Sequence, residues 1–164
     1  MKLIINRPKN LSPFDSDDRS VSEAISTIYS QDEGWIAEID WNGHSILLDG
    51  IMISSIYNDI ISMLLKLESD EKIFKIFFLD SGFTTEWRFT EKEDSIKIEA
   101  MWTSAIGNNK DIKLLDELRR HNSLEIKKNE FIDAWTSLLK VIKEDLIKVG
   151  YNHSLKNFEY LQKL

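Results

Sequence analysis

The chain has 164 residues, the length of one ordinary domain, so we expect a single domain over residues 1–164. It contains no cysteine, which excludes disulfide bonds, thiolate metal sites and cysteine nucleophiles. Its formal net charge of −7 argues against direct contact with nucleic acid, because a DNA or RNA binder needs a basic surface to neutralise phosphates.

The amino-terminal segment, MKLIINRPKN, contains a short apolar run that Arg7 and Pro8 end. Such a run is too short for the core of a signal peptide and far too short to span a bilayer. We therefore expect a cytoplasmic protein without a membrane partner. The segment 7–19 carries no clear signal, and Ser20 and Glu23 then have the spacing of a capping box that opens a short helix.

The stretch EIDWNGHSILLD, residues 38–49, contains the strongest turn signal of the chain. Asn42-Gly43 favours a type I′ turn, because both central positions of that turn need positive φ. The predicted hairpin pairs Trp41 with His44 on an apolar face and leaves the carboxylates on the other face. A catalytic cluster, a metal site and a solvated sheet face are the alternatives, and we favour the last, since His44 and the carboxylates point in opposite directions. The solvated face carries Glu38, Asp40 and Asp49.

The middle of the chain predicts a helix and three further strands. Residues 54–68 place apolar side chains on one helical stripe behind a serine pair that could cap the first turn. The almost unbroken apolar run KIFKIFFLD, residues 72–80, predicts a central strand covered on both faces. Residues 83–90 and 96–102 alternate apolar and polar side chains, which completes a three-strand antiparallel meander. Its charged face includes Glu86 and Glu99.

The last third of the chain predicts one long helix. The stretch DIKLLDELRR, residues 111–120, fits a short helix only ambiguously, and SLEIKK, residues 123–128, fits a strand better. From Asn129, a candidate cap, to Val149 the apolar residues keep helical spacing, and Gly150 stands where a C′ glycine belongs. The tail from residue 154 predicts one more short helix.

These elements together predict an α+β fold. In it an antiparallel sheet, made of the hairpin and the meander, packs against the long C-terminal helix and shorter helices. The tryptophans occupy strand positions on the apolar side or the stripe of the long helix, so we interpret them as core residues. They are Trp35, Trp41, Trp87, Trp102 and Trp135.

Motifs for catalysis are missing from the sequence. It contains neither a phosphate-binding loop, a dinucleotide fingerprint nor a nucleophile elbow. The histidines at 44, 121 and 153 lie in separate segments, and acidic pairs such as Glu91 and Glu93 lie in predicted loops where nothing desolvates them. We therefore expect no enzyme activity, no cofactor and no metal, and instead protein binding through a sheet edge or an acidic face.

Two long stretches resemble small bacterial immunity proteins of contact-dependent growth inhibition and related polymorphic toxin systems. They are ILLDGIMISSIYNDIISMLLKL (46–67) and LEIKKNEFIDAWTSLLKVIKEDL (124–146), and the pattern W-x-x-x-I-x-W at 35–41 and the central FFLDSG add to the likeness. The similarity spans most of residues 34–149. It implies a non-catalytic protein that binds the C-terminal domain of a secreted toxin, often a nuclease.

The resemblance transfers no partner-binding residue, so the binding residues are chosen by charge. A basic toxin domain would be attracted by exposed carboxylates, and we expect it to contact Glu38, Asp40, Asp49, Glu86 and Glu99. Two alternatives of other classes remain: a small enzyme with an unrecognised carboxylate site, and an adaptor with an unrelated protein partner.

Overall fold

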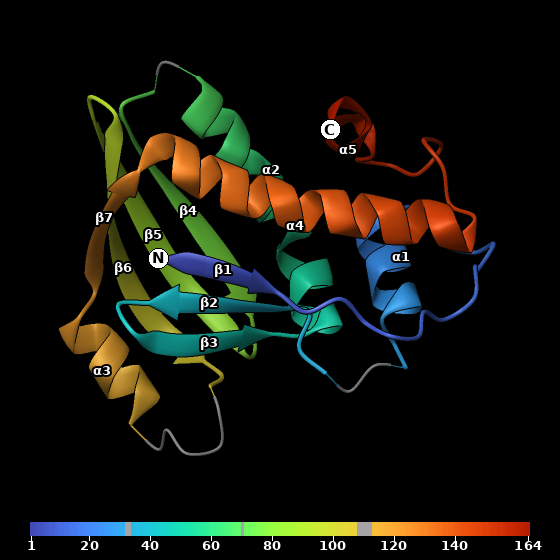
Figure 1. Cartoon of the computed structure of the whole chain (residues 1–164), viewed down its shortest axis with the longest axis horizontal. Coiled ribbons are helices and arrows are strands. Elements are labelled where there is room, and N and C mark those ends of the chain that lie inside the picture. The colour runs from blue at the N-terminus through green and yellow to red at the C-terminus, as the bar shows by residue number, and fades with distance from the viewer. Residues whose placement is uncertain (32–33, 70, 108–112) are drawn as a thin grey trace.

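The computed structural model describes residues 1–31, 34–69, 71–107 and 113–164, and it has the predicted α+β fold (Figure 1). Two antiparallel sheets are present, one of order β1-β2-β3 and one of order β4-β5-β6-β7. In chain order the elements are β1 (Lys2–Ile5), α1 (Val21–Ile28), β2 (Ala37–Trp41), β3 (His44–Leu48), α2 (Gly50–Glu68), β4 (Ile73–Asp80), β5 (Phe83–Lys92), β6 (Ser95–Ala105), α3 (Leu114–Arg120), β7 (Ser123–Lys127), α4 (Lys128–Val149) and α5 (Glu159–Lys163).

The three-stranded sheet is built around the predicted hairpin. Asn42 and Gly43 both have positive φ, 53° and 84°, and the register places Trp41 opposite His44, as the turn signal requires. Strand β1 is an addition that the sequence did not indicate. It pairs antiparallel with β2, from Lys2 opposite Asp40 to Ile5 opposite Ala37, so β2 becomes the central strand.

The four-stranded sheet contains the predicted meander, and β7, the predicted SLEIK strand, pairs with β6 as a fourth strand. The prediction that residues 72–80 form a central strand covered on both faces is wrong. Strand β4 is an edge strand, and its side chains alternate between buried and exposed. The apolar run was misleading because the composition of a strand does not reveal whether other strands pair with it on both edges.

Helix α2 begins earlier than expected, and this removes Asp49 from the hairpin face. The helix starts at Gly50 and not at residue 54, because the Asp49 side chain caps it by accepting a hydrogen bond of 2.8 Å from the Met52 N–H. A side chain at Gly50 would not fit, since a Cβ there would lie 2.4 Å from the Cβ of Tyr29 at the end of α1. Asp49 is therefore a structural cap.

The other helices follow their sequence signals to different degrees. The capping box of Ser20 and Glu23 opens α1, and Gly150 ends α4 in the left-handed conformation with φ 118°. The proposed cap at Asn129 is wrong, because α4 already begins at Lys128 and its cap residue makes no side-chain hydrogen bond. The ambiguous helix at 111–120 exists as α3 from Leu114 onward, and residues 111–112 lie outside the described residues.

The core lies where the two sheets and α4 meet. Trp41 of β2 contacts Trp87 and Trp102 of the four-stranded sheet, with ring centroids 5.3 and 5.1 Å apart. Helix α4 crosses in front of that sheet in Figure 1, and its Phe131 and Trp135 pack on Trp87. Four of the predicted core tryptophans are thus buried, whereas Trp35 precedes β2 and is only half-buried.

Helix α2 is long and apolar enough, by length and composition, to cross a membrane. A core helix passes the same test, and half of the apolar window of α2 is buried inside the fold, where it packs against α1 and β4.

Candidate functional site

The carboxylates predicted to bind a partner lie on two different surfaces. Glu38 and Asp40 of β2 point outward from the three-stranded sheet, and Glu86 and Glu99 point outward from the four-stranded sheet. The inner faces of the two sheets meet in the tryptophan core, so the outer faces point away from each other. The structure therefore does not unite the predicted residues in one site.

The carboxylates of the three-stranded sheet are engaged within the hairpin. Glu38 accepts a hydrogen bond of 2.6 Å from the Ser45 hydroxyl, and Asp40 accepts one of 2.7 Å from the Gly43 N–H. Strand β1 adds Lys2 directly opposite Asp40. Both acids remain partly exposed. Each already accepts a hydrogen bond within the hairpin, which a contact with the toxin would have to preserve or replace.

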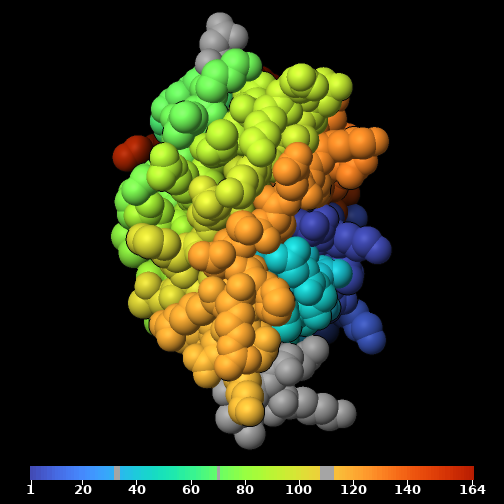
Figure 2. Space-filling model, turned by 90° about the vertical axis from the view of Figure 1, so that its left-hand side faces the viewer, coloured from blue at the N-terminus to red at the C-terminus, as the bar shows by residue number. Residues whose placement is uncertain are grey.

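The outer face of the four-stranded sheet is the more distinctive surface. No helix passes over it in Figure 2, where the strands from β4 to β7 form a broad continuous area above α3. Four large apolar side chains project from it, and we call them the apolar patch: Ile73 (57% exposed), Phe77 (53%), Leu79 (70%) and Met101 (63%). Scattered apolar residues are normal on a surface, but several on one uncovered sheet face are typical of a binding site.

The register explains how the apolar patch and the predicted carboxylates alternate. Phe77 of β4 is opposite Glu86 of β5, which in turn is opposite Met101 of β6. A shallow hollow lies in this area. Its lining is Lys75, Glu86, Arg88, Glu99, Ala100, Met101 and Asn122.

The charges on this face are largely paired with one another. Glu86 forms an ion pair with Lys75, and Glu99 forms one of 2.9 Å with Lys97. The hydrogen bond from Lys97 lowers the pKa of Glu99 below its ordinary value. The predicted charged face therefore carries paired charges of both signs: Lys75 of β4 reaches Glu86 on the neighbouring strand, and Lys97 lies two residues before Glu99 on β6 itself.

Two other carboxyl groups depart from ordinary titration behaviour. Glu91 was expected in a solvated loop but belongs to β5, where hydrogen bonds from Lys128 and Lys72 lower its pKa. Burial raises the pKa of Asp59 on α2, a property typical of catalytic acids. Within the described part of the chain no ion pair or hydrogen bond joins Asp59 to a second titratable group, so it gives the enzyme alternative a single residue and no acid–base pair.

One cluster escaped the sequence analysis altogether. His44 of β3 meets Glu117 and His121, and one ligand atom from each lies within 4.8 Å of the other two. Glu117 lies on α3 and His121 directly follows it. Their i, i+4 spacing is the part of the cluster that could have been recognised in the sequence. His44 lies far away along the chain, and only the contact between α3 and β3 unites the three groups.

The comparisons with known proteins give no relative that could assign a role to either surface. No model of a protein family, no curated protein and no solved structure matches this chain.

Proposed function

We propose that this chain is an immunity protein that binds the C-terminal domain of a bacterial toxin and neutralises it stoichiometrically. The sequence resemblance implies that the toxin is a nuclease. The toxin domain docks on the outer face of the four-stranded sheet. The observation that carries the docking face is the apolar patch, whose four side chains are each more than half exposed.

The physical argument is that this face offers both affinity and orientation. Removing apolar surface from water stabilises a complex by about 25 cal/mol per Å², and aromatic anchors near the middle of an interface contribute most. Phe77 stands beside the ion pairs of Glu86 and Glu99, so apolar contacts would be flanked by fixed charges that select a register. The overall charge of −7 would speed the encounter with a basic domain.

The first test replaces the centre of the apolar patch. Phe77→Thr with Leu79→Thr keeps strand-forming residues and should leave folding intact, because both side chains are exposed. The gene immediately upstream is the first place to look for a toxin domain, and a C-terminal toxin domain encoded there would serve as the probe. We expect the double variant to bind it at least about 30-fold more weakly, mainly through faster dissociation, since buried anchors control dissociation.

The matched control is Ile147→Gln, which removes an apolar side chain of similar exposure, 52%, from α4. It should bind and protect like the wild type. Co-expression of the toxin domain with each variant in a bacterial host gives a second reading, because only chains that bind will permit growth. A wild-type chain that neither binds nor protects would remove the immunity proposal, and equal binding by all variants would remove the docking face.

A second prediction concerns the carboxylates of the hairpin. Glu38→Lys with Asp40→Lys takes the net charge from −7 to −3. We expect slower association with a basic toxin domain and a flatter dependence of the rate on salt, because exposed charges steer the encounter and are screened by ions. Stopped-flow association at two ionic strengths measures both quantities.

The control for charge alone is Glu130→Lys with Asp133→Lys on the exposed side of α4, which changes the net charge equally. If both pairs slow association to the same degree, Glu38 and Asp40 act only through the total charge. If the hairpin variant alone also dissociates faster, the toxin contacts the three-stranded sheet and the assignment to the four-stranded sheet is wrong. Wild-type rates in the hairpin variant would identify these acids as solubility charges.

A further inference from the structure

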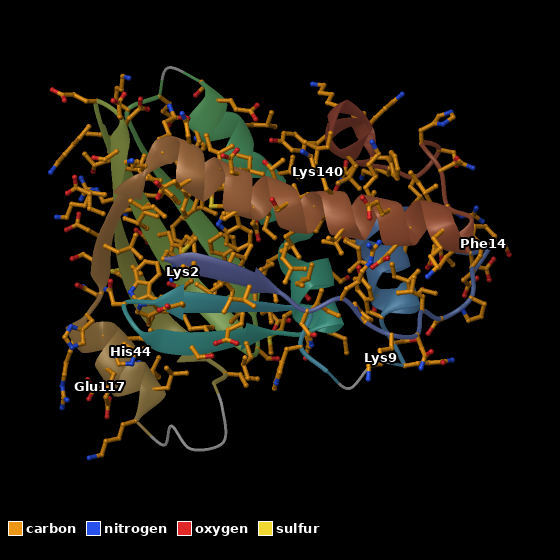
Figure 3. All side chains as sticks on the ribbon, viewed as in Figure 1. Lys2, Lys9, Phe14, His44, Glu117 and Lys140 are labelled. Atoms are coloured by element: carbon orange, nitrogen blue, oxygen red, sulfur yellow. The ribbon has the colours of Figure 1, made fainter. Side chains whose placement is uncertain are left out.

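We propose that His44, Glu117 and His121 form a binding site for a divalent transition-metal ion of the zinc class, which clamps α3 to the hairpin of β2 and β3. Figure 3 shows His44 and Glu117 side by side where α3 meets the end of the hairpin. Among the residues that the structure describes, this is the one group of three histidine or acidic side chains close enough to share an ion. The proposal does not depend on the toxin partner.

The distances are within reach of a metal ion. The three ligand atoms lie within 4.8 Å of one another, and a tetrahedral zinc ion with ligand distances of about 2.1 Å needs separations of about 3.4 Å. Binding therefore requires the side chains to rotate toward one another, and all three retain solvent access, so the core does not lock them in place. Two imidazoles and one carboxylate suit zinc, nickel, cobalt or copper and do not suit calcium or magnesium, which prefer oxygen ligands.

The fold holds the three positions by contacts that need no metal. The backbone carbonyl of His121 accepts hydrogen bonds from the Trp41 indole at 2.8 Å and from the Asn42 amide at 3.2 Å. The Arg119 side chain donates to the Trp102 carbonyl at 3.1 Å, which attaches α3 to β6. The site is therefore preorganised between two anchored elements, and this lowers the entropy lost on binding.

The three side chains already contact one another at the proposed site. The rings of His44 and His121 stack with centroids 5.7 Å apart and planes 24° from parallel. One carboxylate oxygen of Glu117 accepts a hydrogen bond of 2.7 Å from Arg120, and the other faces the Nε2 of His121 at 3.9 Å. Arg120 thus fixes the carboxylate as an outer partner of a metal ligand does, while one oxygen stays turned toward the histidines.

A plain helix-terminal ion pair is the competing explanation. His121 lies just beyond the last turn of α3 and faces the Glu117 carboxylate at 3.9 Å, an i, i+4 contact that needs no metal ion. That explanation gives His44 no role beyond ring stacking. The two explanations differ in whether a metal binds and whether its affinity depends on all three residues.

The test is a calorimetric titration of the full, tag-free chain with zinc chloride. We expect one ion per chain and a raised thermal midpoint in its presence, because a ligand that binds only the folded state stabilises it. His44→Gln, His121→Gln and Glu117→Gln should each weaken binding at least about tenfold, as losses of metal ligands or their partners do. Circular dichroism verifies that the variants fold.

The third histidine supplies the matched control, since His153 is exposed and lies in the segment between α4 and α5. His153→Gln should bind zinc like the wild type. Cobalt in place of zinc gives a second reading, because the intensity of its visible bands reports tetrahedral coordination. Absence of binding would overturn the proposal, and so would binding that His44→Gln and His121→Gln leave unchanged.

Discussion

Replacing Trp135 by alanine is expected to lower the free energy of unfolding by about 3–5 kcal/mol. Trp135 is completely buried in the middle of α4, and its ring packs edge-on against Trp87 of β5, with centroids 6.2 Å apart, and in a tilted arrangement against Phe131 at 6.3 Å. Alanine would leave a cavity at the junction of α4 and the four-stranded sheet. Because a typical domain is stable by only about 5–15 kcal/mol, the loss would take a large share of the total.

Denaturant unfolding followed by far-ultraviolet circular dichroism measures this effect. Trp35→Ala is the matched control, because it removes the same side chain from a half-buried position before β2 and should cost much less. Trp135→Phe keeps an aromatic ring in the core and should fall between the wild type and Trp135→Ala. Equal midpoints for Trp135→Ala and the wild type would contradict the packing of α4 described above.

Replacing Asp145 by alanine should cost about 2–3 kcal/mol, in a helix position where a charged residue looks replaceable. Asp145 is 1% exposed, and its carboxylate accepts hydrogen bonds from the Arg7 guanidinium at 2.7 and 3.0 Å and from the Tyr29 hydroxyl at 3.1 Å. It therefore joins the segment after β1, the end of α1 and α4. Burial, together with the neighbouring Asp145, raises the pKa of Tyr29, so this hydroxyl remains a donor at neutral pH.

The cost arises because the alanine variant leaves a buried hydroxyl without its acceptor. Glu144→Ala is the matched control: Glu144 is the preceding residue and contacts the same guanidinium at 3.0 Å, but its side chain is 62% exposed. A solvated ion pair of this kind contributes little to stability. Denaturant unfolding of both variants compares them directly, and equal losses would show that the burial of Asp145 does not matter.

Local chemistry in the sequence was sufficient to determine a large part of the fold. Asn42-Gly43 set the register of the hairpin, because few residues tolerate two successive positive φ angles. The capping box of Ser20 and Gly150 after α4 marked helix ends, since both act within one turn. The period-two pattern of the meander gave the buried face of β5 and β6 correctly.

The tertiary structure alone decided which strand became an edge, and with it the candidate binding site. Ile73, Phe77 and Leu79 belong to an apolar run whose outward half stays exposed, because no helix or strand among the described residues covers that face. The same holds for one of the ion pairs: Lys75 of β4 meets Glu86 of β5 only in the folded sheet, whereas Lys97 and Glu99 are already neighbours on one face of β6. Strand pairing brings Lys75 and Glu86 together, and a period-two pattern does not specify which strands become neighbours.

Contacts between distant segments decided the rest. Asp145 interrupts the apolar stripe of α4 and is buried only because Arg7 and Tyr29 arrive from the opposite end of the chain. Along the chain, α2, three strands of the four-stranded sheet and α3 lie between His44 and His121. The two histidines meet because the Trp41 indole donates a hydrogen bond to the carbonyl of His121. The sequence by itself determined most of the elements, whose signals act over a few residues, but it did not indicate β1. The binding face and the histidine cluster depend on how those elements pack, which no short-range pattern encodes.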